Sequence, residues 1–186
     1  DLQKLMATLG LSTAKLGFES RTAGLTDFWG QRLRAAFGTL TDASDLFPDL
    51  RRHKSLAEVE MHRRAAALSD DALDGALNTT GAGAFEGDIL AAMQGAVFKG
   101  GGDYAGNEFI IGSAKSALLC RSASSRRRLD AQDQLTIEWS GAYARYHAAM
   151  MQTLIVGQAS TAHRKMHAAA NEALMACEAA IKPGAP

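Results

Sequence analysis

The sequence predicts an α+β fold, in which a few strands lie among longer helices. Two observations support this class. Apolar residues recur at helical spacing in several segments between residues 54 and 181, and the segment DQLTIEWSGAYARYHAAMMQTLIVG (133–157) is typical of two strands joined by a short turn. No repeat of solenoid period interrupts this order. Residues 1–50 have a separate α/β pattern, so we expect two parts, 1–50 and 51–186.

The first part alternates short helices with short strands. DLQKLMATLG is predicted to form a helix closed by Gly10, and LTDFWGQRLRAAFG a helix that ends at Gly38, because glycine is favoured just past a helix C-terminus. KLGFES and TLTDAS are predicted to be strands, and Pro48 lies near the end of this part.

The second part begins with the clearest helix, KSLAEVEMHRRAAALSDDALDGAL (54–77). Ser55 and Glu58 have the spacing of a capping box. Residues 78–87 break this helix, and DILAAMQGAVF (88–98) is predicted to form the next one, stopped by three glycines. The buried stripe of the first helix is predicted to be Met61, Ala65, Leu68, Ala72 and Ala76.

Three strand regions follow. NEFIIGS (107–113) and SALLCR (116–121) are predicted strands, and the hairpin 133–157 supplies two more. STAHRKMHAAANEALMACEAAI (160–181) is predicted to be a long helix that ends before Pro183.

Composition excludes several classes of protein. The chain has 186 residues, 47% of them apolar, and its 20 basic residues balance its 20 acidic ones, which argues against a general nucleic-acid binder. Its two cysteines have no metal-binding spacing and suggest no disulfide framework, so a cytoplasmic location fits best. No apolar run is long enough to span a membrane and no signal peptide is visible. Both ends look cut, and we expect a piece of a longer protein.

Three segments together resemble the pita-bread fold that creatinase, prolidase, aminopeptidase P and methionine aminopeptidase share. They are LRRHKSLAEVEMHRRAAALSDDAL, GGDYAGNEFIIGS and LTIEWSGAYARYHAAMMQTLIVG. The resemblance implies that 51–186 is the first half of a pita-bread (creatinase-like) domain and that 1–50 is the tail of the preceding α/β domain. It also implies a homodimer. Without the second half of the fold, we expect LTIEW (135–139) to form an exposed, unpaired edge strand.

The resemblance breaks down at the metal ligands. Metal-dependent members carry one Asp at the start of the hairpin and a second Asp eleven residues later. Glu138 stands at the first of these places here and Ala149 at the second, and alanine cannot bind a cation. The resemblance therefore implies a variant without metal or other cofactor, similar to creatinase and ectoine hydrolase.

The hairpin also supplies the candidate catalytic pair. By resemblance, Glu138 orients or activates the substrate, and His147, which we expect opposite Glu138 and beside Tyr146, shuttles protons. The alternatives are a carboxylate that faces solvent or pairs with Arg145, and a structural strand histidine.

Three further residues are candidates for substrate binding. Arg121 stands where the family usually has a histidine; arginine cannot act as a base but can grip a substrate carboxylate. The plain interpretation of the surrounding RSASSRRR is a solvated hairpin loop, and the functional ones are an anionic-substrate clamp or a dimer contact. Asp103 and Tyr104 line the substrate by resemblance, or simply belong to a glycine-rich turn.

Two further histidines, His163 and His167, lie four residues apart on the last helix, but no Glu follows the first, so the metalloprotease motif is missing. The sequence thus favours a cytoplasmic, homodimeric hydrolase that cleaves an amide or amidine C–N bond in a small polar compound or short peptide. A metal-dependent Xaa-Pro peptidase and an inactive binding module with this fold are the alternatives.

Overall fold

The computed structural model describes residues 2–119 and 126–185 and divides the chain into two compact units, residues 1–55 and 56–186. The boundary predicted after residue 50 falls inside a short helix, α3 (Leu46–Arg52), that closes the first unit.

The first unit contains the predicted alternation of helices and strands. Its two strands are short and pair in parallel, with Gly17 opposite Thr41. Helix α3, which contains Pro48, was not predicted. Proline is tolerated there because it stands in the first helical turn, where the backbone N–H groups have no intrahelical acceptor. In chain order the other elements are α1 (Leu2–Thr8), β1 (Gly17–Phe18), α2 (Asp27–Phe37) and β2 (Thr41–Asp42).

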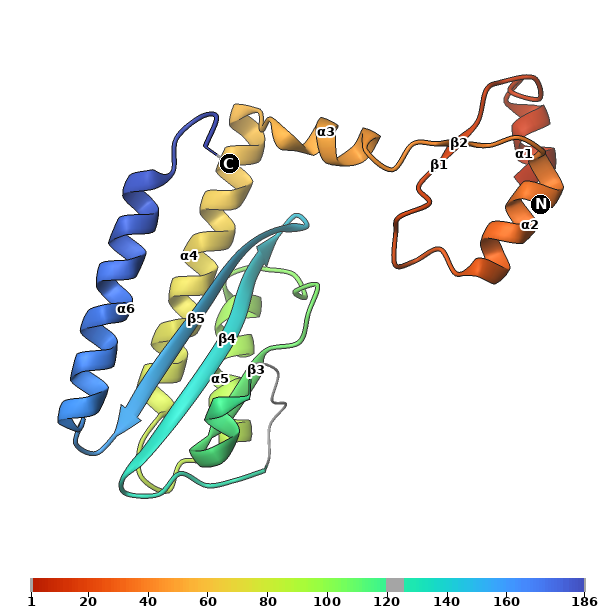
Figure 1. The fold of residues 1–186 in the computed structure, drawn as a ribbon. Coiled ribbons are helices and arrows are strands. Elements are labelled where there is room, and N and C mark those ends of the chain that lie inside the picture. The colour runs from red at the N-terminus through yellow and green to blue at the C-terminus, as the bar shows by residue number, and fades with distance from the viewer. Residues whose placement is uncertain (1, 120–125, 186) are drawn as a thin grey trace. The chain divides into compact units, whose positions relative to one another are not determined.

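The second unit is a mixed α+β structure, which confirms the predicted fold class (Figure 1). Its antiparallel sheet has the strand order β3-β4-β5. Its elements are α4 (Leu56–Thr79), α5 (Glu86–Lys99), β3 (Ile110–Ser113), the 3-10 helix η1 (Ala114–Leu118), β4 (Asp133–Tyr143), β5 (Tyr146–Val156) and α6 (Thr161–Ala180).

Two strand predictions are wrong. The first three residues of the predicted strand SALLCR, 116–118, lie in η1. The chain leaves the sheet after Ser113 because the Ala114 N–H donates to the Asp133 carboxylate (3.2 Å) instead of to a neighbouring strand. Cys120 and Arg121 lie outside the described residues. LTIEW is not an edge strand either: it lies in β4, which pairs with β3 on one side and β5 on the other.

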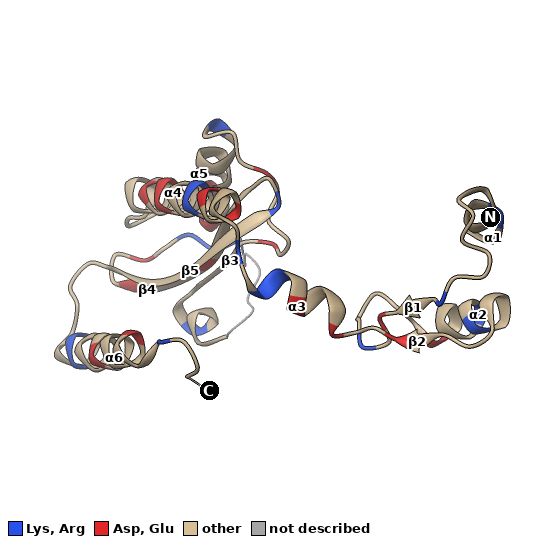
Figure 2. Cartoon of the chain, turned by 90° about the horizontal axis from the view of Figure 1, so that it is seen from above, with Lys and Arg blue, Asp and Glu red and all other residues tan. Residues whose placement is uncertain are grey.

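Helices α4 and α5 cover one face of the sheet, and α6 lies on the opposite side (Figure 2). Leu135, Ile137 and Trp139 of β4 are buried against the two helices, as period-two alternation of a strand requires. The predicted stripe on α4 is buried except at Met61, which is half-buried. None of the side chains of α6 is buried.

Helix α4 and strand β4 approach most closely at Gly141. A Cβ on Gly141 would collide with the Ala65 carbonyl and would lie 2.6 Å from the Ser69 nitrogen. Ser69 Oγ accepts the Gly141 N–H (2.7 Å) and donates to the Ala148 carbonyl (2.6 Å). This serine therefore ties the helix to both strands of the hairpin. The hairpin face that points away from α4 and α5 is called the open face below.

Candidate functional site

The open face of the hairpin carries Glu138. Glu138 is half-buried and pairs across the ladder with Met151, which is 55% exposed. Ala149 pairs with Ser140 on the same face. Ala149 is thus a diagonal neighbour of Glu138, and such positions lie roughly 7–8 Å apart between Cα atoms.

These residues do not fit the dinuclear metal site of the metal-dependent proteins that the sequence resembles. Such a site needs several oxygen or nitrogen ligands around each ion, and the second carboxylate position holds the methyl group of Ala149. In residues 2–119 and 126–185, no three His, Cys, Asp or Glu side chains gather in a way that could hold a metal ion.

His147 does not lie opposite Glu138, so this expectation is wrong. Its ladder partner is Ala142, four positions along β4 from Glu138, or about 13 Å at the usual rise of a strand. The reason is the length of the turn. Ala144 and Arg145 alone connect the strands, both with positive φ (48° and 70°), and a two-residue turn fixes the register of every later pair.

Both ring nitrogens of His147 are hydrogen-bonded within the protein. Nε2 accepts the backbone N–H of Gly106 (2.9 Å), and Nδ1 lies 3.0 Å from the Arg145 carbonyl. A nitrogen that accepts an N–H carries no proton, and a carbonyl can only accept. The geometry therefore assigns the ring proton to Nδ1 and a neutral imidazole.

Asp103 and Tyr104 lie at the same end of the hairpin as His147. The Asp103 N–H donates to the Ala142 carbonyl (2.8 Å), and its carboxylate accepts the Arg145 N–H (3.3 Å). Tyr104 is 79% exposed and meets the ring of Phe98 edge-on at 4.8 Å. Asp103 and Tyr104 line a hollow of about 220 Å³ between residues 103–109 and α5. Glu138 is not part of its lining, so the predicted residues fall into two groups.

Glu58 and His62 of α4, which were not among the predicted site residues, contact the hairpin at Tyr146 and His147. The Tyr146 hydroxyl donates to Glu58 Oε1 (3.1 Å), and His62 Nδ1 lies 3.2 Å from the His147 carbonyl. The rings of His62 and Tyr146 meet edge-on at 5.1 Å. The four-residue spacing of Glu58 and His62 on one face of α4 was the signal that could have pointed to them.

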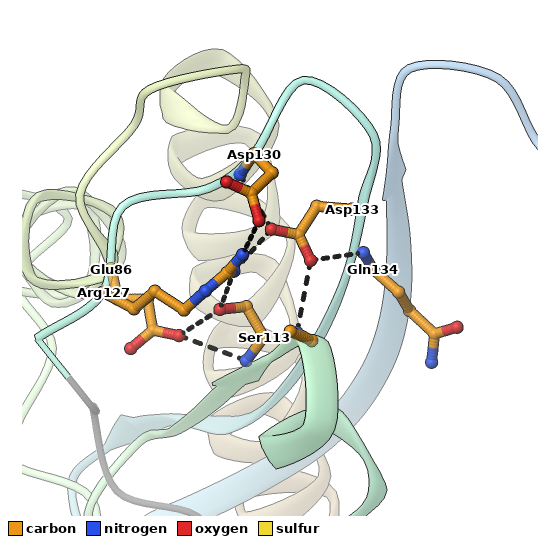
Figure 3. A network of polar contacts seen from close by, with 7 residues as sticks. Glu86, Ser113, Arg127, Asp130, Asp133 and Gln134 are labelled. Carbon is orange, nitrogen blue, oxygen red and sulfur yellow. Dashed lines mark hydrogen bonds and ion pairs between the residues drawn. The ribbon is translucent and has the colours of Figure 1, made fainter.

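A buried polar network joins β3, β4 and the start of α5 (Figure 3). Glu86 Oε1 accepts both the N–H (3.1 Å) and the hydroxyl (2.6 Å) of Ser113. Arg127 donates to Ser113 Oγ (2.7 Å) and forms ion pairs with Asp133 and Asp130. Glu86 and Ser113 are almost fully buried, so the network fixes β3 and α5 to the start of β4.

Asp133 is the centre of this network. Its side chain is 3% exposed and accepts the N–H groups of Asp130 (2.8 Å), Gln134 (2.9 Å) and Ala114 (3.2 Å). Burial alone would raise the pKa of this carboxyl, but the backbone donors and the Arg127 guanidinium outweigh it and lower the pKa below its usual value. Nothing in the sequence marks Asp133 for this role, because one Asp at a strand start has no distinctive pattern.

The histidine pair on α6 has a structural use. Ser160 and His163 form a reciprocal capping box, in which His163 Nδ1 accepts the Ser160 N–H (3.3 Å) and Ser160 Oγ accepts the His163 N–H (3.1 Å). His167 Nδ1 lies 3.4 Å from Asn171 Nδ2.

Among the helices that the structure describes, none is both long and apolar enough to cross a membrane.

Comparison with known proteins adds relatives of the same fold. The chain is 25% identical over 140 residues to a Xaa-Pro dipeptidase of Pyrococcus furiosus, a match that covers 75% of this chain and 40% of the relative. An X-Pro aminopeptidase structure from Thermotoga maritima superposes with a TM-score of 0.77 at 20% identity, over 90% of this chain and 46% of that one. A Xaa-Pro dipeptidase from Bacillus anthracis gives 0.74 at 25% identity, over 88% and 45%.

The chain therefore spans about 40% of the length of the curated relatives it matches, and its fold is part of the pita-bread domain. The sequence profile of one family, described as metallopeptidase family M24, matches residues 60–186, which include the whole hairpin. We conclude that the chain belongs to metallopeptidase family M24.

Proposed function

We propose that the protein is a hydrolase that opens an amide or amidine C–N bond of a small polar substrate without the dinuclear metal site of its family. One observation supports this above the others: a methyl group, that of Ala149, occupies the diagonal neighbour position of Glu138. A two-metal site needs ligands that hold both ions, and alanine offers no donor atom.

In this proposal Glu138 orients or activates the substrate on the open face, and Arg121 grips an anionic group. Asp103 and Tyr104 line the hollow that receives another part of the substrate. The proton-shuttle role predicted for His147 is not part of this proposal, because four strand positions, or about 13 Å of backbone, separate its ladder position from Glu138. The expected homodimer and cytoplasmic location stay predictions.

The second candidate is a metal-dependent Xaa-Pro peptidase. The observation in its favour is that several relatives are named as Xaa-Pro peptidases, among them the Xaa-Pro dipeptidase of Pyrococcus furiosus. For this chain to work in that way, ligands outside the described residues would have to compensate for Ala149.

Metal content and chelator sensitivity separate the two candidates. We expect the purified protein to contain no stoichiometric transition metal and to hydrolyse small amides or amidines equally well after EDTA treatment. About two Mn, Co or Zn ions per chain, with Xaa-Pro cleavage that EDTA abolishes, would establish the metallopeptidase instead. A metal-free protein that cleaves neither class of substrate would refute both and leave a binding module.

Glu138 is tested by substitution. Glu138→Gln keeps the shape and removes the charge, so kcat should fall by roughly 100-fold or more if the carboxylate acts on the reacting group. Gln134→Ala, on the same face four residues earlier, is the control and should leave kcat unchanged. Equal activity of the two variants would remove Glu138 from the mechanism.

A further inference from the structure

The loop at residues 103–109 is attached to the hairpin at two places. At its start, Asp103 donates to the Ala142 carbonyl (2.8 Å) and accepts the Arg145 N–H (3.3 Å). At its middle, Gly106 donates its N–H to His147 Nε2 (2.9 Å). Of these three bonds, only that of His147 is made by a side chain of the strand, and only it reaches the middle of the loop.

The His147 ring is held in the orientation that this bond needs. Its Nδ1–H faces the carbonyl of Arg145 two residues earlier (3.0 Å), which leaves the lone pair of Nε2 to point at Gly106. The backbone carbonyl of His147 lies 3.2 Å from His62 Nδ1 of α4, so the strand itself is anchored at this residue. A ring protonated on both nitrogens has two donors and could not accept the Gly106 N–H.

We propose that His147 is a positioning residue. Its neutral imidazole holds the middle of loop 103–109, and thereby the wall of the hollow that Asp103 and Tyr104 line, and it does not exchange protons with the substrate. The inference rests on the proposed function only in taking this hollow as part of the substrate site. Loss of the bond therefore weakens substrate binding and leaves the chemical step unchanged.

The first test is the tautomer. In the ¹⁵N-labelled protein, long-range ¹H–¹⁵N correlations of the His147 ring should show a protonated Nδ1 and an unprotonated Nε2 near neutral pH. A protonated Nε2 is incompatible with the Gly106 bond and would overturn the inference without any activity assay.

The second test compares two substitutions that both remove the imidazole. In His147→Gln the side-chain oxygen can reach the former Nε2 position and accept the Gly106 N–H, whereas the side chain of His147→Asn is one carbon shorter and cannot. Neither amide exchanges protons near neutral pH. Hydrogen exchange of the Gly106 amide should stay slow in the Gln variant and become roughly tenfold faster in the Asn variant. Equal exchange rates of the Gly106 amide in wild type and both variants would show that the hydrogen bond to His147 does not hold the loop.

Kinetics then separate positioning from proton transfer. We expect the Gln variant to keep kcat and KM, and the Asn variant to keep kcat while KM rises roughly tenfold. A collapse of kcat in both variants, with the Gly106 amide still protected in the Gln variant, would show that the imidazole acts as a base. If the wild-type protein shows no hydrolysis, the tautomer and exchange tests still show whether His147 holds Gly106. Failure of the proposed function is therefore distinguishable from failure of this inference.

Discussion

Asp133→Asn tests the buried polar network with little change in volume. The carboxylate of Asp133 accepts three backbone N–H groups, two of them on Oδ1 and one on Oδ2, and Oδ2 also pairs with Arg127. The amide of Asn has one oxygen and one NH₂ group. Whichever way it turns, two donors lose their acceptor and face an NH₂ group.

The expected loss of unfolding free energy is about 3 to 5 kcal/mol. A hydrogen bond to a charged group contributes roughly 1.5–3 kcal/mol, and two are lost. Removing one partner of a buried ion pair costs a similar amount, about 3–5 kcal/mol. These two figures describe the same perturbation and are not summed. The 26% exposure of the Arg127 side chain lets water solvate the remaining charge and favours the lower end.

Asp130→Asn is the matched control, because Asp130 pairs with the same guanidinium but its side chain is 74% exposed. An exposed pair contributes up to about 1 kcal/mol. Urea unfolding can be followed by the fluorescence of Trp139, which is buried in the same unit, in a Trp29→Phe background that removes the other tryptophan. Equal losses for the two variants, or a loss below about 1 kcal/mol for Asp133→Asn, would refute the reasoning.

The pH dependence has a definite sign. Since the folded-state pKa of Asp133 is lowered, its contribution is complete above the unfolded value of about 3.9 and is lost as pH falls through the folded value. The difference in unfolding free energy between wild type and Asp133→Asn should therefore be constant near neutrality and shrink below about pH 4. A difference that grows in acid would contradict this assignment.

Three further substitutions test the packing of the second unit by the same unfolding assay. Gly141→Ala should cost at least about 1–3 kcal/mol, because its Cβ collides with backbone atoms of α4, whereas Gly95→Ala, with nothing within 4 Å, should stabilise α5 by about 0.5–1 kcal/mol. Ser69→Ala leaves the Gly141 N–H and the Ala148 carbonyl without their serine partner and should cost about 1–3 kcal/mol. A stable Gly141→Ala protein would show that α4 and β4 can separate without cost.

The sequence by itself determined the elements whose signal is local. The 3.6-residue periodicity of α4 predicted both the helix and its buried stripe at Ala65, Leu68, Ala72 and Ala76. The hairpin, the glycine stop after α5 and the α+β class follow from patterns of the same kind. The resemblance at the hairpin identified Glu138 and Ala149 as family site positions, and the ladder places them on one face.

Tertiary structure decided what depends on partners distant in sequence. The two-residue turn at Ala144 and Arg145 pairs His147 with Ala142, four positions from Glu138. The alternation of apolar and polar residues cannot reveal a register error of four residues, because each side chain stays on the same face of the sheet. The Asp133 carboxylate accepts the N–H of Ala114, which lies 19 residues earlier in the chain, and residues 116–118 of the predicted strand SALLCR lie in η1. Gly106, far from His147 in sequence, uses the lone pair that a base would need. Helix and strand propensities and hydrophobic periodicity depend only on residues that are near in sequence. A hydrogen-bond partner that is distant in sequence is determined only when the chain has folded.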